Sequence, residues 1–502
     1  VEKQVVENVI AEYERRQYRT ARNNELMKDD KARFAGLGKV TVTVTPRPQD
    51  QKAISPDLFG VFFEDINYAA DGGLYAELVQ NRGFEYSDAD HPRHEGWGPA
   101  YAWRTYGGAA LSFDTANPIH ANNAHYAVLD VDKPGDAMAN TGFDGIAVKQ
   151  GDTYLLSLFG RMVEGNGRRV RVALRTKDGR EIGSATVTLP RDGWRKLDAK
   201  IKATETAADA ELAIMPEAAG RYAFDMVSLF PKDTYKGRRN GLRRDLAEAI
   251  ANLKPRFVRF PGGCVAHGNG IQNIYRWKNT VGPLESRKGM ANIWRYHQSV
   301  GLGFYEYFQF CEDMGAEPLP VLNVGMACQY QNRNNEKAHV PVDELDPYIQ
   351  DCLDLIEFAN GDTTTTWGKK RAEMGHPAPF NLKFIAVGNE QWGDFYFVRM
   401  QKFVDAIRAK YPKIQIIGTS GPDSEGKNFD LGWEAMKRQK VDLVDEHFYR
   451  PESWFLTSGL RYEKYDRKGP KVFAGEYACH GKGKKWNHYE TSLYEAAFMT
   501  DL

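Results

Sequence analysis

The chain alternates short apolar segments with segments of helical periodicity, and this alternation limits its fold more than any other feature. Apolar runs that carry few charges are typical of strands in a parallel sheet covered by helices on both faces. The pattern predicts a (β/α)8 TIM barrel in an α/β chain, with seven of the eight strands visible. The predicted strands are 57–63, 256–260, 317–324, 383–389, 414–420, 441–448 and 471–477. The predicted helices are 74–84, 242–253, 303–314, 344–359, 395–409, 429–438 and 488–500.

A second pattern interrupts the first. Residues 86–232 contain short alternating segments separated by Gly, Asp, Asn and Pro, which is typical of an all-β sandwich with jelly-roll topology. The predicted organisation is therefore a charged helical leader, a strand segment that includes KVTVTVTP, the first βα unit, the inserted sandwich and the remainder of the barrel. These parts span residues 1–37, 38–56, 57–85, 86–232 and 233–502.

The charge balance favours a neutral partner. The 67 Lys and Arg residues equal the 67 Asp and Glu residues, so there is no basic field to attract nucleic acid or an anionic membrane. No apolar run reaches the length of roughly 18 residues that a membrane helix needs. Five cysteines without a CxxC pair predict free thiols and no structural zinc. We expect no metal and no organic cofactor.

Polar side chains stand where the predicted barrel strands end, which is where barrel enzymes carry their chemistry. Two glutamates, Glu390 and Glu476, close the apolar segments FIAVGNE and VFAGE. Strands four and seven lie on opposite sides of an eight-stranded barrel, so these carboxyl groups are predicted to face each other across its mouth. Glycoside hydrolysis needs such a pair, one as proton donor and one as nucleophile or base. The alternative is a structural salt bridge at each glutamate.

Several motifs together resemble one family. The segments are FGVFFEDINYAADGGLYAELVQNRGFE (59–85), RFVRFPGGC (256–264), YRWKNTVGP (275–283), VGNEQWG (387–393), DEHFY (445–449) and FAGEYA (473–478). They resemble the α-L-arabinofuranosidases of glycoside hydrolase family 51, in clan A. The resemblance implies that Glu390 is the acid/base and Glu476 the nucleophile, with Asn389 near the sugar 2-hydroxyl. It also implies that Glu64, Cys264 and Tyr449 hold the furanose ring or orient the nucleophile.

Other residues near the strand ends are less specific, and for Arg259 and His447 two interpretations stay open. Arg259 either pairs with Glu64 or holds a carboxylate such as Glu476 in its ionised form. Cys264 is predicted to be a small buried group without a covalent role, and His447 is either a core histidine or a site residue. Three tryptophans either stack on sugar or pack in the core: Trp277, Trp392 and Trp486.

The inserted sandwich resembles the carbohydrate-binding modules that interrupt the first βα unit in some family members. Its aromatic residues either line a sugar cleft or wedge the insert against the barrel; they are Trp97, Tyr101, Trp103 and Tyr106. Family members continue through an eighth strand and a C-terminal β-sandwich, and we expect both to be absent from this sequence.

The predicted function is that of a retaining exo-α-L-arabinofuranosidase acting on neutral, arabinose-containing oligo- or polysaccharides. A clan A endo-glycanase that cuts β-glucan or xylan is the alternative enzyme, and a non-catalytic carbohydrate-binding protein is the alternative from another class. We expect secretion or a periplasmic location, with the cytoplasm as the alternative, and we leave a homo-oligomer open.

Overall fold

The structure is a computed structural model that describes residues 55–333, 335–481 and 488–502, with four isolated positions nearer the N-terminus, Gln17, Thr41, Thr43 and Thr45. The predicted leader helix (1–37), the predicted strand within 38–56 and Trp486 lie outside the described residues. The chain forms two compact units: a larger one, Phe59–Thr419, and a smaller one that contains Ser420–Leu502.

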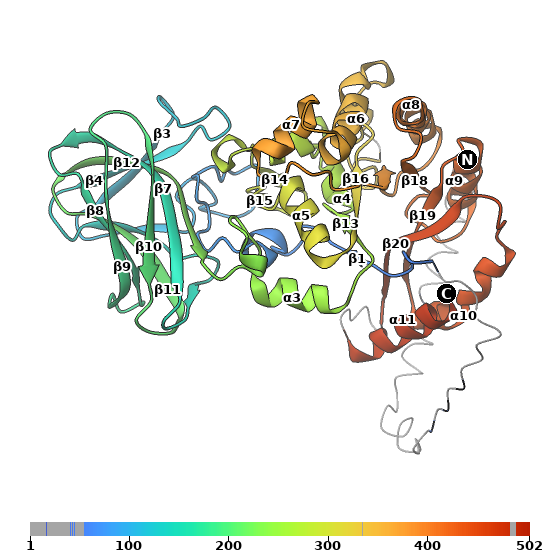
Figure 1. Ribbon diagram of the computed structural model, residues 1–502, viewed down its shortest axis with the longest axis horizontal. Coiled ribbons are helices and arrows are strands. Elements are labelled where there is room, and N and C mark those ends of the chain that lie inside the picture. Colours follow the sequence, from blue (N-terminus) through green and yellow to red (C-terminus); the bar gives the residue numbers. More distant parts are fainter. Residues whose placement is uncertain are drawn as a thin grey trace. The chain divides into compact units, whose positions relative to one another are not determined.

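Five parallel strands form the sheet of the larger unit (Figure 1). Their order is that of the sequence: β1 (Val61–Phe62), β13 (Phe257–Phe260), β16 (Glu317–Leu322), β17 (Phe384–Val387) and β18 (Gln415–Thr419). All four residues of β17 are buried, as expected for a strand covered on both faces. The five strands predicted in this part of the chain are confirmed.

Helices follow the strands of the larger unit as the periodicity predicts. They are α3 (Arg244–Asn252), α5 (Phe304–Met314), α6 (Asp346–Asn360), α7 (Thr366–Glu373) and α8 (Asp394–Lys410). Gly315 ends α5 in the left-handed conformation, with φ of 69°, where its backbone N–H closes the last turn. A helix of one turn, α4 (Cys264–His267), and helix α7 were not predicted from the sequence.

The helix predicted over residues 74–84 is wrong. This segment is irregular, and its backbone pairs with distant chain: Ala76 N–H donates to Gly241 at 3.2 Å, and Leu78 N–H donates to Leu229 at 3.0 Å. Glu77, within this segment, is buried, and its carboxylate accepts hydrogen bonds from Arg82 at 3.2 Å and from the Leu229 N–H at 2.8 Å. These tertiary bonds satisfy the backbone and the carboxylate together, and they replace the helical pattern that the spacing of apolar residues suggested.

An antiparallel sandwich interrupts the larger unit between β1 and β13 (Figure 1). One sheet has the order β10-β7-β12-β4-β3, and the other has the order β2-β5-β11-β8-β9, with β6 beside β11. The first sheet contains β3 (Ala110–Asp114), β4 (Tyr126–Val131), β7 (Thr153–Gly165), β10 (Arg195–Lys202) and β12 (Gly220–Pro231). The second contains β2 (Trp103–Tyr106), β5 (Ala137–Asn140), β6 (Ile146–Val148), β8 (Arg169–Arg175), β9 (Glu181–Thr188) and β11 (Ala207–Pro216).

Alternation along the sandwich strands builds one apolar core. Val170 and Val172 of β8 are fully buried, whereas Arg169 and Arg171, which alternate with them, are exposed. This period of two places every second side chain on the inner face of its sheet. The predicted all-β insert is confirmed as an element of the fold.

The smaller unit contributes two further parallel strands, β19 (Leu443–Arg450) and β20 (Lys471–Cys479). Its helices are α9 (Lys427–Arg438), α10 (Glu452–Thr457) and α11 (Tyr489–Asp501). Phe448, Phe455 and Phe498 pack together between strand and helices. With these strands, all seven predicted barrel strands exist, and the chain has the (β/α)8 barrel fold class with an inserted sandwich.

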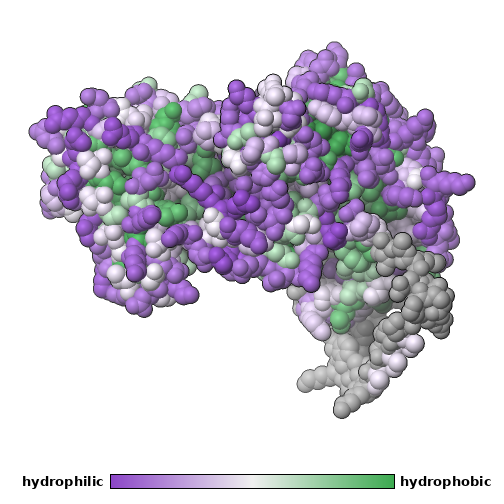
Figure 2. Space-filling view, viewed as in Figure 1, coloured by the Kyte–Doolittle hydropathy of each residue, from purple (hydrophilic) through white to green (hydrophobic). Residues whose placement is uncertain are grey.

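The face of the molecule in Figure 2 is covered mainly by hydrophilic side chains. Among the residues that the structure describes, no helix is both long enough and apolar enough to cross a membrane.

Candidate active site

Glu64 and the PGGC loop lie together at the carboxyl ends of β1 and β13. Gly262 has a φ of 147°, and a Cβ there would approach the Glu64 Cγ to 2.5 Å, so only glycine allows this contact. The Val265 N–H donates to the Glu64 carboxylate at 3.1 Å. The loop therefore fixes the Glu64 side chain at the strand end, as a candidate group for binding hydroxyls.

Arg259 is fully buried in β13, and its guanidinium holds the candidate sugar-binding amide. Its Nη2 donates to Asn389 Oδ1 at 2.6 Å, and its guanidinium carbon lies 4.7 Å from the centre of the Phe62 ring. Asn389 is also buried, and its own backbone N–H donates to the Gln391 side chain. These bonds fix the orientation of the Asn389 amide.

Glu390 follows β17 in an unusual backbone conformation. Its φ is 57°, and that of Gly388 two residues earlier is 103°. A left-handed residue other than glycine costs of the order of 1 kcal/mol, and such residues cluster at functional sites. With positive φ angles at both Gly388 and Glu390, the side chains of Asn389 and Glu390 have different surroundings: Asn389 is buried, and Glu390 is partly exposed.

Cys264 lies beside a second thiol. Its Sγ is 3.2 Å from Cys328 Sγ, and all five cysteines, each among the described residues, are free thiols as predicted. The hydrogen bond with Cys328 and burial raise the pKa of Cys264 well above its ordinary value. The raised pKa favours the neutral form of the Cys264 thiol, and its lack of a covalent role stays a prediction.

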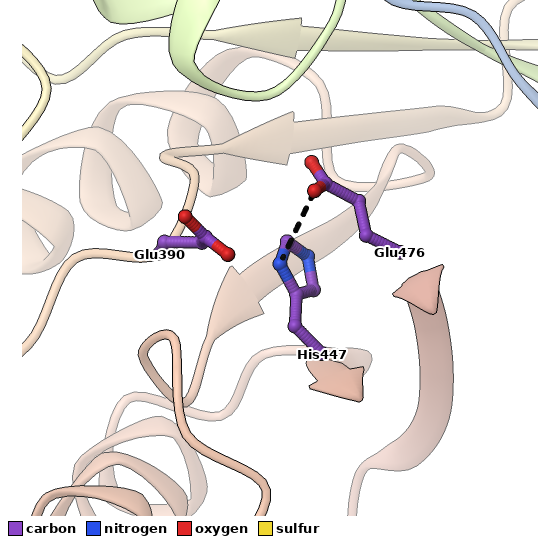
Figure 3. Close-up of side chains that lie close together, drawn as sticks. All are labelled: Glu390, His447 and Glu476. Atoms are coloured by element: carbon purple, nitrogen blue, oxygen red, sulfur yellow. Dashed lines mark ion pairs between the residues drawn. The ribbon is translucent and has the colours of Figure 1, made fainter. Parts of the chain in front are cut away.

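The smaller unit holds Glu476 between two side chains of β19. Tyr449 donates its hydroxyl to Glu476 Oε2 at 2.8 Å, and His447 Nδ1 lies 3.7 Å from the same oxygen (Figure 3). His447 is fully buried, and its Nε2 lies 3.2 Å from Asp445 Oδ2. The histidine is thus both buried and in contact with the candidate nucleophile, so the two interpretations offered from the sequence do not exclude each other.

Comparisons with known proteins identify the family. Residues 249–467 match the family model described as the alpha-L-arabinofuranosidase 1 domain, and residues 76–220 match that of a carbohydrate binding domain. Alpha-L-arabinofuranosidase 2 of Arabidopsis thaliana is 34% identical over 92% of this chain and 67% of its own length. The chain belongs to the α-L-arabinofuranosidases of glycoside hydrolase family 51.

Two further relatives agree with this family. The extracellular exo-alpha-L-arabinofuranosidase of Streptomyces chartreusis is 45% identical over 92% of this chain, which spans only 55% of that protein. The solved structure of an arabinose-bound family 51 α-L-arabinofuranosidase superposes with a TM-score of 0.77 at 31% identity, covering 89% of this chain and 72% of the other. The chain thus spans about half the length of the first relative, and the roles of individual residues stay predictions.

Among the tryptophans of this family 51 chain, Trp277 packs in the core and is not available for stacking. It is 1% exposed, donates to the Asp351 carbonyl at 2.8 Å and contacts Phe358 and Trp367. Trp392 is partly exposed, and its backbone is held by two hydrogen bonds with Gln329, at 3.0 and 3.2 Å. Trp392 therefore stays a stacking candidate.

The aromatic residues of the insert have different surroundings. Trp97 is buried, stacks on Tyr86 and shares a cluster with Tyr296 of β15 (Tyr296–Gln298), which lies in the barrel sequence. Trp103 is buried against Phe84 within the sandwich core. The wedge interpretation therefore fits Trp97, and neither tryptophan can line an open cleft. Tyr101 and Tyr106 are partly exposed.

Sequence reasoning missed several buried polar residues at the site. Asp445, Cys328 and Gln391 are all buried next to predicted site residues. The signal for Asp445 was present in DEHFY, because a carboxylate inside an otherwise apolar strand needs partners. Cys328 and Gln391 had no comparable signal.

Proposed function

We propose that this chain carries the catalytic machinery of a retaining exo-α-L-arabinofuranosidase, which removes terminal α-L-arabinofuranosyl groups from polysaccharides of the arabinoxylan or arabinan type. The observation that carries the proposal is a glutamate on each of two barrel strands, both held by their surroundings: Glu390 just after β17 and Glu476 within β20. Membership of family 51 supports it, and so does the exo-acting enzyme named from Streptomyces chartreusis.

The proposed reaction is a double displacement. Glu476 attacks the anomeric carbon while Glu390 donates a proton to the leaving oxygen, which gives a covalent arabinosyl ester. Glu390, now a carboxylate, takes a proton from water, and the water oxygen displaces Glu476. Two inversions release arabinose with its configuration retained, and this mechanism requires the two carboxyl groups to be about 5–5.5 Å apart.

The remaining site residues are proposed to bind the sugar or support these two groups. Asn389, held by Arg259, is suited to donate to the 2-hydroxyl, where hydrogen bonds strengthen in the transition state. Glu64 is suited to accept from ring hydroxyls, and Tyr449 donates to the nucleophile. Cys264 contributes only contact area.

Hydrolysis of an aryl α-L-arabinofuranoside tests the proposal with three variants. Glu476→Ala and Glu390→Ala should each lose roughly 10²–10⁴-fold in kcat or more. Azide should give an α-arabinofuranosyl azide with Glu390→Ala only, because the small anion replaces water after the ester has formed and its attack is the second of two inversions. Glu434→Gln, which changes an exposed carboxylate on α9, is the control, and its kcat should equal that of the unchanged chain.

The outcomes separate the alternatives. Turnover that survives Glu476→Ala contradicts the mechanism, and internal cleavage of β-glucan or xylan favours the endo-glycanase. Sugar binding without any turnover by the unchanged chain favours the non-catalytic carbohydrate-binding protein.

We further propose that the inserted sandwich binds neutral polysaccharide. A groove of about 400 Å³ is lined by Tyr101, Arg104, Lys177 and Glu211 among others, and the match to a carbohydrate binding domain supports this use. Tyr101→Ala should weaken retention on insoluble arabinoxylan about tenfold, whereas Tyr489→Ala, at an exposed tyrosine of α11, should not. Equal retention of both variants contradicts the proposal.

Location and partners follow from the same reasoning. The Streptomyces relative is named extracellular, which supports secretion or a periplasmic location here. The net charge of zero supports a neutral polysaccharide partner over nucleic acid or a membrane surface. A homo-oligomer stays an open prediction.

A further inference from the structure

Asp445 is a buried carboxylate of β19 that contacts two groups next to the proposed nucleophile. Its Oδ1 accepts a hydrogen bond from the Gly475 N–H at 2.8 Å, and its Oδ2 lies 3.2 Å from His447 Nε2. Only 1% of its surface is exposed. A carboxylate at this depth is costly unless both oxygens have partners, and these two contacts provide them.

The local backbone makes room for this carboxylate. A Cβ at Gly475 would lie 2.3 Å from Asp445 Oδ1, so only glycine fits at this position. The register between β19 and β20 shifts at the same place: Glu446 pairs with Ala474, whereas His447 pairs with Glu476. The shift skips Gly475 and brings Glu476 opposite His447.

His447 connects Asp445 to Glu476. Its Nδ1 lies 3.7 Å from Glu476 Oε2, the oxygen that also accepts from Tyr449, and Figure 3 shows the ring edge directed at that carboxylate. With a carboxylate at each ring nitrogen, the imidazolium form can donate on both sides, and each negative charge favours this cation.

The neighbouring carboxylate has a different environment. Glu446 points to the other side of β19, because successive strand residues face opposite ways. It accepts hydrogen bonds from Trp433 at 2.9 Å, Tyr465 at 2.8 Å and Tyr462 at 3.1 Å. Burial raises its pKa, and the three donors oppose that shift. Glu446 therefore offers a matched control: a buried carboxylate on the same strand with no contact to His447 among the described bonds.

We propose that Asp445 is a positioning residue for the nucleophile: it fixes the ring and positive charge of His447, and His447 in turn holds Glu476 ionised and oriented for attack. The inference rests on the proposed role of Glu476. No bond to substrate forms at Asp445, which acts through the histidine alone.

The decisive variant is Asp445→Asn. The amide has nearly the same size and can still accept from the Gly475 N–H, but it removes the negative charge beside His447. The ring then loses its preference for the cation, and the Glu476 carboxylate loses a positive neighbour that favours its charged form. The acidic limb of the kcat/KM profile reports such groups in the free enzyme.

We expect kcat/KM of Asp445→Asn toward an aryl α-L-arabinofuranoside to fall about 10- to 100-fold at the acidic limb, and the limb to move up by roughly 0.5–1 pH unit. Glu446→Gln should leave the limb where it is, even if it lowers the melting temperature. His447→Gln should reproduce the loss, and the double variant Asp445→Asn/His447→Gln should be no worse than His447→Gln alone. The proposal would be overturned if the acidic limb of the kcat/KM profile of Asp445→Asn did not move, or if the double variant lost more kcat/KM than His447→Gln alone.

A measurement without turnover separates this inference from the proposed function. The ¹⁵N chemical shifts of the His447 ring, assigned by comparison with His447→Gln, should show protonation at both nitrogens at pH 6 in the unchanged chain and a neutral ring in Asp445→Asn. Identical shifts in the two proteins contradict the role of Asp445. If the shifts change as expected but Glu476→Ala keeps its turnover, the assignment of the nucleophile fails, and the role inferred for Asp445 fails with it.

Discussion

Asp65, which follows the candidate sugar-binding residue Glu64, makes the stability of the larger unit depend on pH. Its side chain is 6% exposed, and its Oδ1 accepts from the Ala70 N–H at 3.1 Å and from the Tyr296 hydroxyl at 2.8 Å. Burial, with the charge of Asp71 as a further cause, raises the pKa of Asp65 from 3.8 to about 7. The two donors oppose this shift without cancelling it.

The direction of the pH dependence follows from the pH at which Asp65 loses its proton in the unfolded and in the folded chain. The unfolded chain loses it near pH 3.8, and the folded chain loses it near pH 7. The folded state therefore binds more protons between these values, and the free energy of unfolding falls as the pH rises through that window. Above pH 7 the loss is complete, at roughly 4 kcal/mol for a pKa difference of about three at 1.36 kcal/mol each.

Asp65→Asn removes this loss, because the amide resembles the protonated acid in size and hydrogen bonding. At pH 8 the variant should be more stable than the unchanged chain by up to about 4 kcal/mol. At pH 4 the two should differ by less than about 1 kcal/mol. Thermal and urea unfolding at both pH values, with Asp198→Asn as an exposed control, measure the difference. If Asp65→Asn is equally destabilised at both pH values, the carboxylate is ionised in the folded state and the reasoning is refuted.

Three further substitutions test individual contacts. Tyr449→Phe removes the hydroxyl that donates to Glu476 at 2.8 Å, so kcat/KM should fall about 10- to 100-fold, while Tyr477→Phe on β20 stays near the unchanged rate. Equal rates for both variants would contradict a role for the Tyr449 hydroxyl. Cys264→Ser should keep kcat within about tenfold, since the thiol is neutral and has no covalent step; complete inactivation with intact folding would disprove that. Trp97→Ala should destabilise the larger unit by about 3–5 kcal/mol in urea unfolding, because it empties a buried aromatic position; unchanged stability would contradict the assignment of Trp97 to the core.

Local patterns were sufficient for the architecture. The seven barrel strands and most helices were predicted because an apolar run or a helical face depends on residues within about 10–15 positions. The insert was recognised for the same reason, as its alternating strands and turn residues differ from the βα pattern on either side. The helix prediction for residues 74–84 failed although the apolar residues there have helical spacing. Hydrogen bonds from the segment's backbone to Gly241 and Leu229, and those to the buried Glu77 carboxylate, take the place of the helical hydrogen bonds.

The candidate site was predictable in its residue types but not in its contacts. The positions of Glu390 and Glu476 at strand ends follow from the sequence, because parallel strands all point the same way. The bond from Arg259 to Asn389 joins residues 130 apart, and no local pattern carries that information. The thiol contact of Cys264 with Cys328 spans 64 residues and was equally invisible.

The sequence by itself therefore determined the seven barrel strands and most of the helices, that the chain has a barrel with an inserted sandwich, and which polar side chains lie toward the strand ends. These follow from periodicity and hydrophobicity, which act over short distances along the chain. The tertiary structure alone decided which buried groups are partners: Asp445 with Gly475 and His447, and His447 with Glu476. The physical reason is that a buried charge takes its preferred state from the atoms around it, and packing brings those atoms from distant parts of the chain.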